Sequence, residues 1–131
     1  MKTPNATVNR ILVVEDEPAI CDLCKRVLSG EGFEVGIAAN GKVAQDMIED
    51  KKYDLFLVDI RTPEMDGREL YQWMQEKHLQ LASRVIFTSG SVIGKDTMAF
   101  IDQTGRLFLP KPFTPDELKT IVTETLKEVG K

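Results

Sequence analysis

The sequence is poor in the residues that build zinc sites, signal peptides and membrane anchors. Its 131 residues include two cysteines and one histidine, His78, so a zinc site at the cysteines would need two further good ligands. No hydrophobic run approaches the roughly 20 residues of a membrane-spanning helix. The first ten residues, MKTPNATVNR, lack the hydrophobic centre of a signal peptide. We therefore expect a cytoplasmic protein with no membrane contact.

An excess of positive charge is also missing. The net charge is −4 and the pI is near 5.1, which disfavours binding to nucleic acid through a basic face. The phosphate-binding pattern G-x-x-x-x-G-K-[ST] does not occur. Hydrophobic residues make up 42% and charged residues 29%, which is typical of one folded domain with its own core. We predict a polar tail over residues 1–9 and a single domain over residues 10–131.

The two cysteines, Cys21 and Cys24, form a C-x-x-C pair that allows two interpretations. A redox motif can occur where a strand leads into a helix. However, hydrophobic residues recur at helical spacing through this segment, at Ile20, Leu23, Cys24, Val27 and Leu28. The second interpretation, in which Cys24 is a small buried residue of an amphipathic helix, is the favoured one.

Five short strand-like runs alternate with helical segments along the chain. The predicted strands are Arg10–Val14, Phe33–Ala38, Tyr53–Asp59, Arg84–Ser89 and Arg106–Pro110. Helices are expected from Pro18 to about Gly30, after Asn40, after Gly67, over Lys95–Thr104 and after Thr114. This alternation predicts an α/β fold with one parallel, doubly wound sheet and five helices. Hydrophobic and polar residues alternate most in the second predicted strand, which is therefore expected at an edge of the sheet. The other four strands are nearly continuous hydrophobic runs and are expected to be buried on both faces.

Polar residues follow the ends of the predicted inner strands. Glu15 and Asp16 follow the first strand, Asp59 ends the third, Thr88 lies near the end of the fourth, and Lys111 follows the fifth. Ligands of open parallel sheets bind at this carboxyl edge. Carboxylates placed close together repel one another unless a cation lies between them, and oxygen ligands favour Mg²⁺. An aspartate beside such an ion, with a lysine and a hydroxyl nearby, could accept a phosphoryl group.

Each of these residues also has an ordinary structural interpretation. Glu15 and Asp16 could cap the first helix, Asp59 could form a turn, Thr88 could bond within its strand, and Lys111 could be a solvated loop residue. Taken one at a time, those interpretations are favoured for all but Asp59. Taken together they fail, because they do not explain why all five fall at the same ends of the strands.

Four motifs, VVEDEP, LFLVDIRTPEMDG, VIFTSG and FLPKPF, resemble those of the response-regulator receiver domains of bacterial two-component signalling. The resemblance extends from about Arg10 to Lys127 and is closest to the chemotaxis-regulator type. It implies the flavodoxin-like strand order 2-1-3-4-5. It also implies a phosphoacceptor domain that takes a phosphoryl group from a histidine kinase or a histidine phosphotransfer protein.

The resemblance assigns a role to each residue of the carboxyl edge. Asp59 would be the phosphoacceptor, and Glu15, Asp16, Asp59 and the backbone carbonyl of Arg61 would bind Mg²⁺. Lys111 and Thr88 would contact the phosphoryl group, and Lys111-Pro112 would be a cis peptide bond. Phe108 would be the aromatic switch residue that moves when Thr88 moves.

The surface of the predicted fourth helix, fifth strand and fifth helix would then change and bind an unidentified downstream protein or a second copy of the chain. The hydrophobic spacing of Lys95–Thr104 is weak, with Met98 and Ile101 on one line and Phe100 off it. We take this spacing as a sign of a loosely held helix.

Three alternatives remain open at this stage. The domain could be a receiver from the carboxyl end of a hybrid histidine kinase, which TGRLFLPKPF resembles. An aspartate-nucleophile phosphatase of the haloacid-dehalogenase type would need a second aspartate at the position of Arg61. A binding module that is never phosphorylated would not need the complete set of polar residues. We expect no enzyme activity beyond phosphorylation and dephosphorylation of Asp59 itself.

Overall fold

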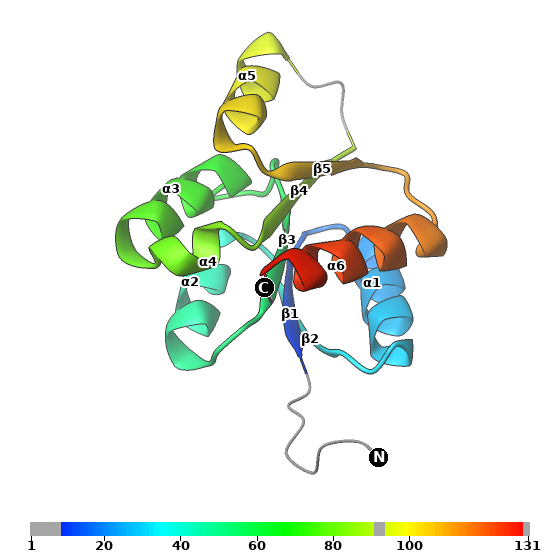
Figure 1. Ribbon diagram of the computed structural model, residues 1–131. Coiled ribbons are helices and arrows are strands. Elements are labelled where there is room, and N and C mark those ends of the chain that lie inside the picture. Colours follow the sequence, from blue (N-terminus) through cyan, green and yellow to red (C-terminus); the bar gives the residue numbers. More distant parts are fainter. Residues whose placement is uncertain (1–8, 91–93, 130–131) are drawn as a thin grey trace.

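The computed structural model describes residues 9–90 and 94–129 and shows an α/β fold with one five-stranded sheet (Figure 1). All neighbouring strands are parallel and their order is β2-β1-β3-β4-β5, as predicted. The strands are β1 (Arg10–Val14), β2 (Glu34–Ala38), β3 (Leu55–Asp59), β4 (Val85–Ser89) and β5 (Leu107–Pro110). The helices are α1 (Pro18–Gly30), α2 (Gly41–Asp50), α3 (Gly67–Lys77), α4 (Leu79–Ala82), α5 (Lys95–Thr104) and α6 (Pro115–Val129).

The short helix α4 was not predicted. It is a single turn that follows α3 directly, after His78. The predicted fourth and fifth helices are therefore α5 and α6 of the structure. Eight residues of the predicted polar tail, residues 1–8, lie outside the described part of the chain.

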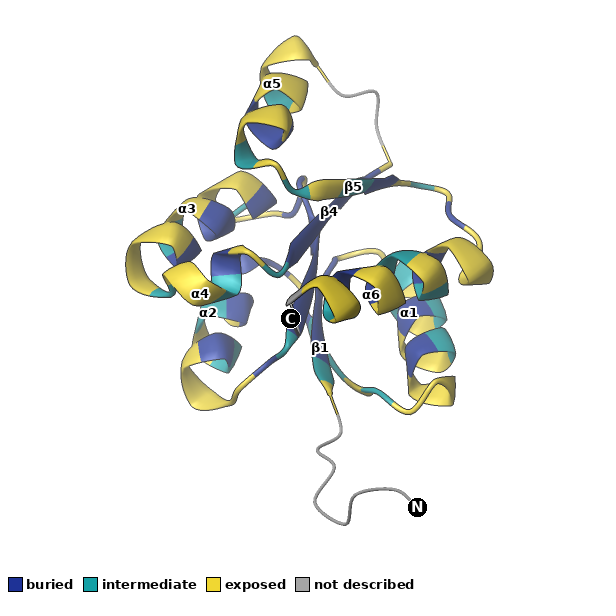
Figure 2. Ribbon diagram, in the orientation of Figure 1, coloured by how far each residue is buried: buried dark blue, intermediate teal, exposed yellow. Residues whose placement is uncertain are grey.

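Helices cover both faces of the sheet, and a hydrophobic cluster fills the space on each side (Figure 2). Along β1, Leu12 and Val14 face the cluster under α2, α3 and α5, whereas Ile11 and Val13 face the cluster under α1 and α6. All four are buried. Full burial of a side chain of this size is worth about 1.5–3 kcal/mol, so the alternating contacts of the central strands hold the sheet between its helices.

The two edges of the sheet are β2 and β5. The edge position of β2 is the one predicted, but the expectation that the fifth strand is buried on both faces was wrong. Leu107 is 44% exposed, whereas Leu109 is buried against the cluster under α6. No further strand lies beyond β5 in the described sheet. A hydrophobic run in this strand can therefore leave some of its side chains exposed to solvent.

Helix α5 is anchored differently from the sequence prediction. Phe100 and Ile101 are its buried residues, and Met98, which was expected to face the core, is exposed. The Phe100 ring lies 5.9 Å from the ring of Tyr71 and 5.7 Å from that of Phe87, both in edge contacts. The guanidinium of Arg68 lies 4.6 Å from the centre of the same ring. Contacts with α3 and β4 therefore decide which face of α5 is buried.

The favoured interpretation of the cysteine pair agrees with the structure. Cys24 is fully buried in the cluster under α1, and burial raises the pKa of its thiol to about 12. Burial also raises the pKa of Cys21. Redox cysteines need a lowered thiol pKa, which neither cysteine has. Cys24 packs α1 against the sheet, and the thiol of Cys21 donates to the backbone carbonyl of Glu15. None of the described helices combines the length and the hydrophobicity needed to cross a membrane.

Candidate functional site

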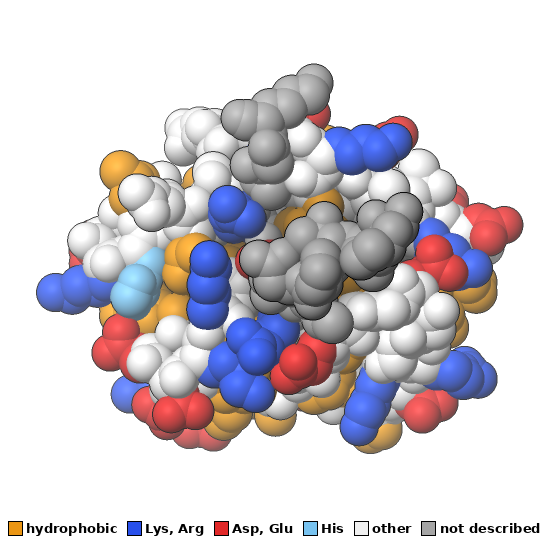
Figure 3. Space-filling model, turned by 60° about the horizontal axis from the view of Figure 1, so that its bottom comes forward, with side chains coloured by type: hydrophobic (Ala, Val, Ile, Leu, Met, Phe, Trp, Pro, Cys, Tyr) orange, Lys and Arg blue, Asp and Glu red, His pale blue; other side chains and the backbone are white. Residues whose placement is uncertain are grey.

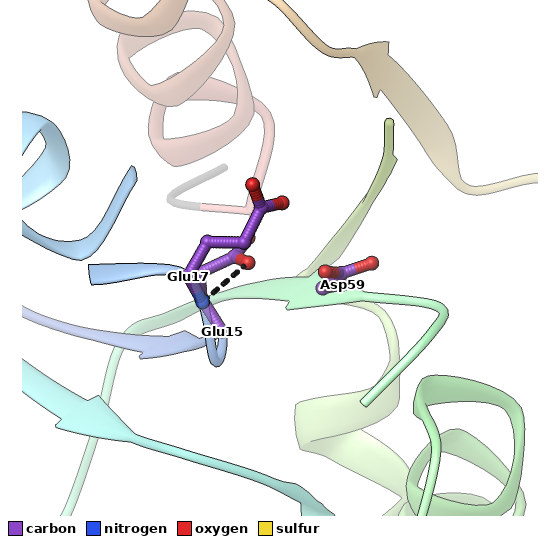
Figure 4. Close-up of side chains that lie close together, drawn as sticks. All are labelled: Glu15, Glu17 and Asp59. Carbon is purple, nitrogen blue, oxygen red and sulfur yellow. Dashed lines mark hydrogen bonds between the residues drawn. The ribbon is translucent and has the colours of Figure 1, made fainter. Parts of the chain in front are cut away.

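The polar residues singled out from the sequence meet at the carboxyl edge of the sheet, where Lys111 contacts both Glu15 and Asp59. Figure 4 shows Glu15 and Asp59 there, together with Glu17. Glu15 and Asp16 follow the last residue of β1, and Asp59 is the last residue of β3. Asp59 and Thr88 are paired across the β3–β4 ladder, and Lys111 follows the last residue of β5. The parallel arrangement of the strands therefore brings residues from four distant parts of the sequence to one place.

Asp59 is almost completely buried, and each of its carboxylate oxygens has a partner. Oδ1 accepts a hydrogen bond of 3.0 Å from the backbone N–H of Arg61, and Oδ2 accepts one of 3.0 Å from Nζ of Lys111. The chain turns sharply after Asp59, where the N–H of Gly67 donates to the carbonyl of Ile60. The hydrogen bonds from Arg61 and Lys111 hold the carboxylate in place at the end of β3.

Lys111 is the centre of the site. Its side chain is 6% exposed, and Nζ lies 3.0 and 3.1 Å from the two oxygens of Glu15 and 2.7 Å from Oε1 of Glu17. Burial by itself would lower the pKa of Lys111. Its hydrogen bonds to Glu17, Glu15 and Asp59 outweigh burial and raise that pKa above the usual range. Lys111 is therefore a permanent positive charge among three carboxylates.

The surroundings of Glu15 disfavour its ionised form. Its side chain is 2% exposed, and burial, assisted by the charge of Asp59, raises its pKa to about 7 even though Lys111 acts in the opposite direction. The single positive charge of Lys111 therefore does not neutralise the negative charge of the carboxylates around it. The site can still attract a further cation.

The carboxylate oxygens have the chemistry and spacing that suit a hard divalent ion. Oxygens of Glu15, Glu17 and Asp59 lie within 4.8 Å of one another, the one such acidic group among the described residues. Glu17 and Asp59 border a hollow of about 510 Å³, which Asp16 and Arg61 also line. Oxygen ligands at an open site are what Mg²⁺ requires. The residues present therefore fit a magnesium ion.

The sequence matches the response regulator receiver domain family over residues 11–123. The chain belongs to this family. Receiver domains act in two-component signalling as phosphoacceptors for histidine kinases, with Mg²⁺ bound at an acidic pocket. The described residues of this receiver domain contain a cluster of acidic side chains, Glu15, Glu17 and Asp59.

Curated relatives and a solved structure support the assignment. The chain is 29% identical over 134 residues to the transcription factor SKN7 of Saccharomyces cerevisiae, covering 96% of this chain and 21% of SKN7. It is 33% identical over 109 residues to the response regulator MprA of Mycolicibacterium vanbaalenii, covering 83% of this chain and 46% of MprA. The chain thus spans less than half the length of these relatives.

A CheY-like receiver domain protein from Methanospirillum hungatei has the same fold. The TM-score is 0.86 at 31% identity, and the match covers 95% of this chain and 98% of the other.

The remaining predicted residues of this receiver domain have these positions. Asp16 is exposed and lines the hollow, Thr88 is buried, and Phe108 is half-buried against the cluster under α3 and α5. The Lys111-Pro112 bond is cis, as the resemblance implied. The individual roles of these residues, including the metal-binding role of the Arg61 carbonyl, stay predictions.

Sequence reasoning missed the contact between Glu17 and Lys111. Glu17 occupies the N-cap position of α1, but its side chain makes no capping hydrogen bond. Its backbone N–H donates to Oε2 of Glu15 (Figure 4). Its own carboxylate accepts a hydrogen bond from Nζ of Lys111. The run Glu15-Asp16-Glu17 was a visible signal, because residues two apart can turn toward the same side where the strand ends.

The end of the sheet where the strands begin, opposite the carboxyl edge, has a different charge arrangement. Figure 3 views the molecule from the end where the strands begin, and acidic and basic side chains lie side by side there. Glu34 pairs with Arg10 at 3.3 Å and with Lys51 at 3.4 Å, and these side chains are substantially exposed. Such surface pairs contribute little to stability. Buried, incompletely compensated acids are a property of the carboxyl edge.

Proposed function

We propose that Asp59 accepts a phosphoryl group from a phosphohistidine of a histidine kinase or histidine phosphotransfer protein. A carboxylate oxygen of Asp59 forms a bond to phosphorus while the bond from phosphorus to the imidazole nitrogen breaks, and that nitrogen keeps the electron pair. The observation that carries the proposal is the 3.0 Å contact between Asp59 and Lys111 among further acids at the carboxyl edge. A lysine in this position can neutralise charge on a transferring phosphoryl group.

The other residues of the site orient the reacting group. Arg61 N–H holds Oδ1 of Asp59, which leaves the second oxygen directed toward Lys111 and the hollow. Mg²⁺ held by Glu15, Asp16, Asp59 and the Arg61 carbonyl would supply positive charge beside the phosphoryl oxygens. Thr88, the partner of Asp59 in the β3–β4 ladder, would donate its hydroxyl to the same oxygens.

Phosphorylation then acts as a switch. The new group adds close to two negative charges and strong hydrogen-bond acceptors. Thr88 turns toward it, and Phe108, on the neighbouring strand β5, moves into the space that Thr88 leaves. The surface formed by α5, β5 and α6 changes as a result, and this surface binds the downstream partner or a second copy of the domain.

The domain has no enzymatic role beyond its own aspartyl phosphate in this proposal. A phosphatase would need an acid two residues after Asp59 to protonate the leaving group, and Arg61 occupies that position. The phosphoryl group therefore leaves Asp59 by transfer to a phosphotransfer protein or by hydrolysis.

Intact mass measurement tests the proposal directly. The protein is incubated with acetyl phosphate and Mg²⁺, and the mass of one phosphoryl group is expected on the wild type. It is not expected on Asp59→Asn or in the presence of a chelator. Asp46→Asn, which changes an exposed acid on α2, is the matched control and should be modified like the wild type. An unmodified wild type, or a modified Asp59→Asn, would overturn the assignment.

A further inference from the structure

Lys111 has more partners than it can hold at full strength. An ammonium group has three N–H donors, whereas four carboxylate oxygens of Glu15, Glu17 and Asp59 lie within 2.7–3.1 Å of Nζ. A phosphoryl group on Asp59 would add further acceptors at the same place. Lys111 can contact these acceptors only if it gives up one of its present partners.

The three acids differ in what they lose when Lys111 moves. The side chains of Glu15 and Asp59 are 2% and 5% exposed, so either carboxylate would remain in the protein interior without its cation, which is strongly unfavourable. The side chain of Glu17 is 59% exposed, so water replaces the ammonium. Glu17 also makes the shortest of the contacts, at 2.7 Å.

We propose, on the basis of the phosphoacceptor function above, that Glu17 is a positioning residue that holds Lys111 in the unphosphorylated state and is exchanged for the phosphoryl group. Glu17 competes with the phosphoryl group for the lysine, so its carboxylate opposes the phosphorylated state. Because it acts through Lys111, Glu17 need not touch the phosphoryl group.

The effect is measured with beryllofluoride, a phosphoryl analogue, at saturating Mg²⁺. Calorimetric titration of Glu17→Gln should show tighter binding of beryllofluoride than the wild type by about two- to fivefold, the range expected for loss of one partly exposed ion pair. Asp22→Asn is the matched control, because Asp22 is an exposed acid on the same helix that does not line the hollow. It removes the same charge and should bind like the wild type.

The exchange itself is observed at the nitrogen of Lys111. In protein labelled with ¹⁵N-lysine, Lys111→Arg identifies the Nζ signal of Lys111. Without beryllofluoride, Glu17→Gln should shift this signal and Asp22→Asn should not. With beryllofluoride, the signals of the wild type and Glu17→Gln should converge, because Lys111 has left Glu17 in both.

Two outcomes would overturn the inference while leaving the phosphoacceptor function intact. One is equal beryllofluoride affinity in the wild type and Glu17→Gln. The other is a difference in the Lys111 signal that persists after beryllofluoride binds. A weaker affinity of Glu17→Gln for Mg²⁺ alone, with no gain for beryllofluoride, would make Glu17 a metal ligand instead. If the wild type itself does not bind beryllofluoride, the proposed function fails as well.

Discussion

Asp59 and Thr88 are partners across the ladder of β3 and β4, although 29 positions separate them in the sequence. On the other side of β4, Thr88 is also the partner of Leu109 in the β4–β5 ladder. Leu109 directly follows Phe108 on β5. A change at the phosphoacceptor can therefore reach the edge strand through one residue of β4. This short path is the basis of the first prediction.

Thr88→Ala should separate phosphorylation from the switch. The aspartate and lysine remain, so Asp59 still binds beryllofluoride, but no hydroxyl turns toward it. In protein labelled with ¹³C-phenylalanine, the shift of the Phe108 ring signals on adding beryllofluoride should fall by more than half. Thr88→Ser keeps the hydroxyl and should keep most of the shift. A full Phe108 response in Thr88→Ala would refute the coupling.

Glu15 should make the metal-free protein less stable as the pH rises toward neutrality. Its pKa is raised in the folded state to about 7 from an ordinary value of 4.5, so below pH 4.5 its contribution to stability is fully present. Between pH 4.5 and 7 the unfolded chain has released the proton that the folded protein keeps, so stability falls by up to about 3 kcal/mol.

Glu15→Gln cannot titrate and should lack this component. Urea unfolding in the presence of a chelator, at pH 4.5 and pH 7.5, measures the difference. The free energy of unfolding of Glu15→Gln, relative to that of the wild type, should increase as the pH rises. A constant difference between the two proteins across this range would show that Glu15 has an ordinary pKa.

Gly67→Ala should destabilise the turn that follows Asp59. A Cβ at Gly67 would lie 2.7 Å from the backbone oxygen of Asp59 and 2.9 Å from Cα of Ile60. Backbone atoms cannot move aside cheaply, so the expected loss is about 1–3 kcal/mol in urea unfolding. Gly30→Ala is the control, since nothing lies within 4 Å of a Cβ there. An unchanged midpoint for Gly67→Ala would mean that this turn is more adaptable than its contacts indicate.

Helix α5 should open more readily than α1. Its buried residues, Phe100 and Ile101, keep some exposure, whereas α1 places Cys24 and Leu28 fully inside the core. Amide exchange in α5 is expected to be on the order of tenfold faster than in α1. Phe100→Leu removes the ring contacts and should accelerate exchange in α5 selectively. Exchange in α5 as slow as in α1 would contradict the prediction of a loosely held helix.

Local signals in the sequence predicted the elements and their order. The runs that form β1 and β3 are hydrophobic because both faces of these strands are covered, and Asn40 and Thr114 start helices because their side chains accept from Val43 and Glu117. These signals depend on residues close together in the chain. They also located the carboxyl edge, because the polar residues directly follow the strands.

Contacts between distant segments could not be predicted in the same way. Phe100 was placed off the buried face of α5 because the helix alone suggested Met98 and Ile101, whereas the rings of Tyr71 and Phe87 decide the packing. The exposure of β5 depends on the absence of a neighbour beyond it in the described sheet. The single turn α4 carries too few residues to show a period.

The sequence by itself determined the parallel α/β architecture and the kinds of side chain at the carboxyl edge. Hydrophobic periodicity and the positions of strand ends depend on residues that are close together in the chain. Only the tertiary structure decided how those side chains share their charges. Lys111 and Glu17 are 94 positions apart, and the folding of β1, β3 and β5 into one sheet brings them to 2.7 Å. The balance between burial and ion pairing that follows sets the pKa of Glu15 and the partners of Lys111, and it exists only once the sheet has formed.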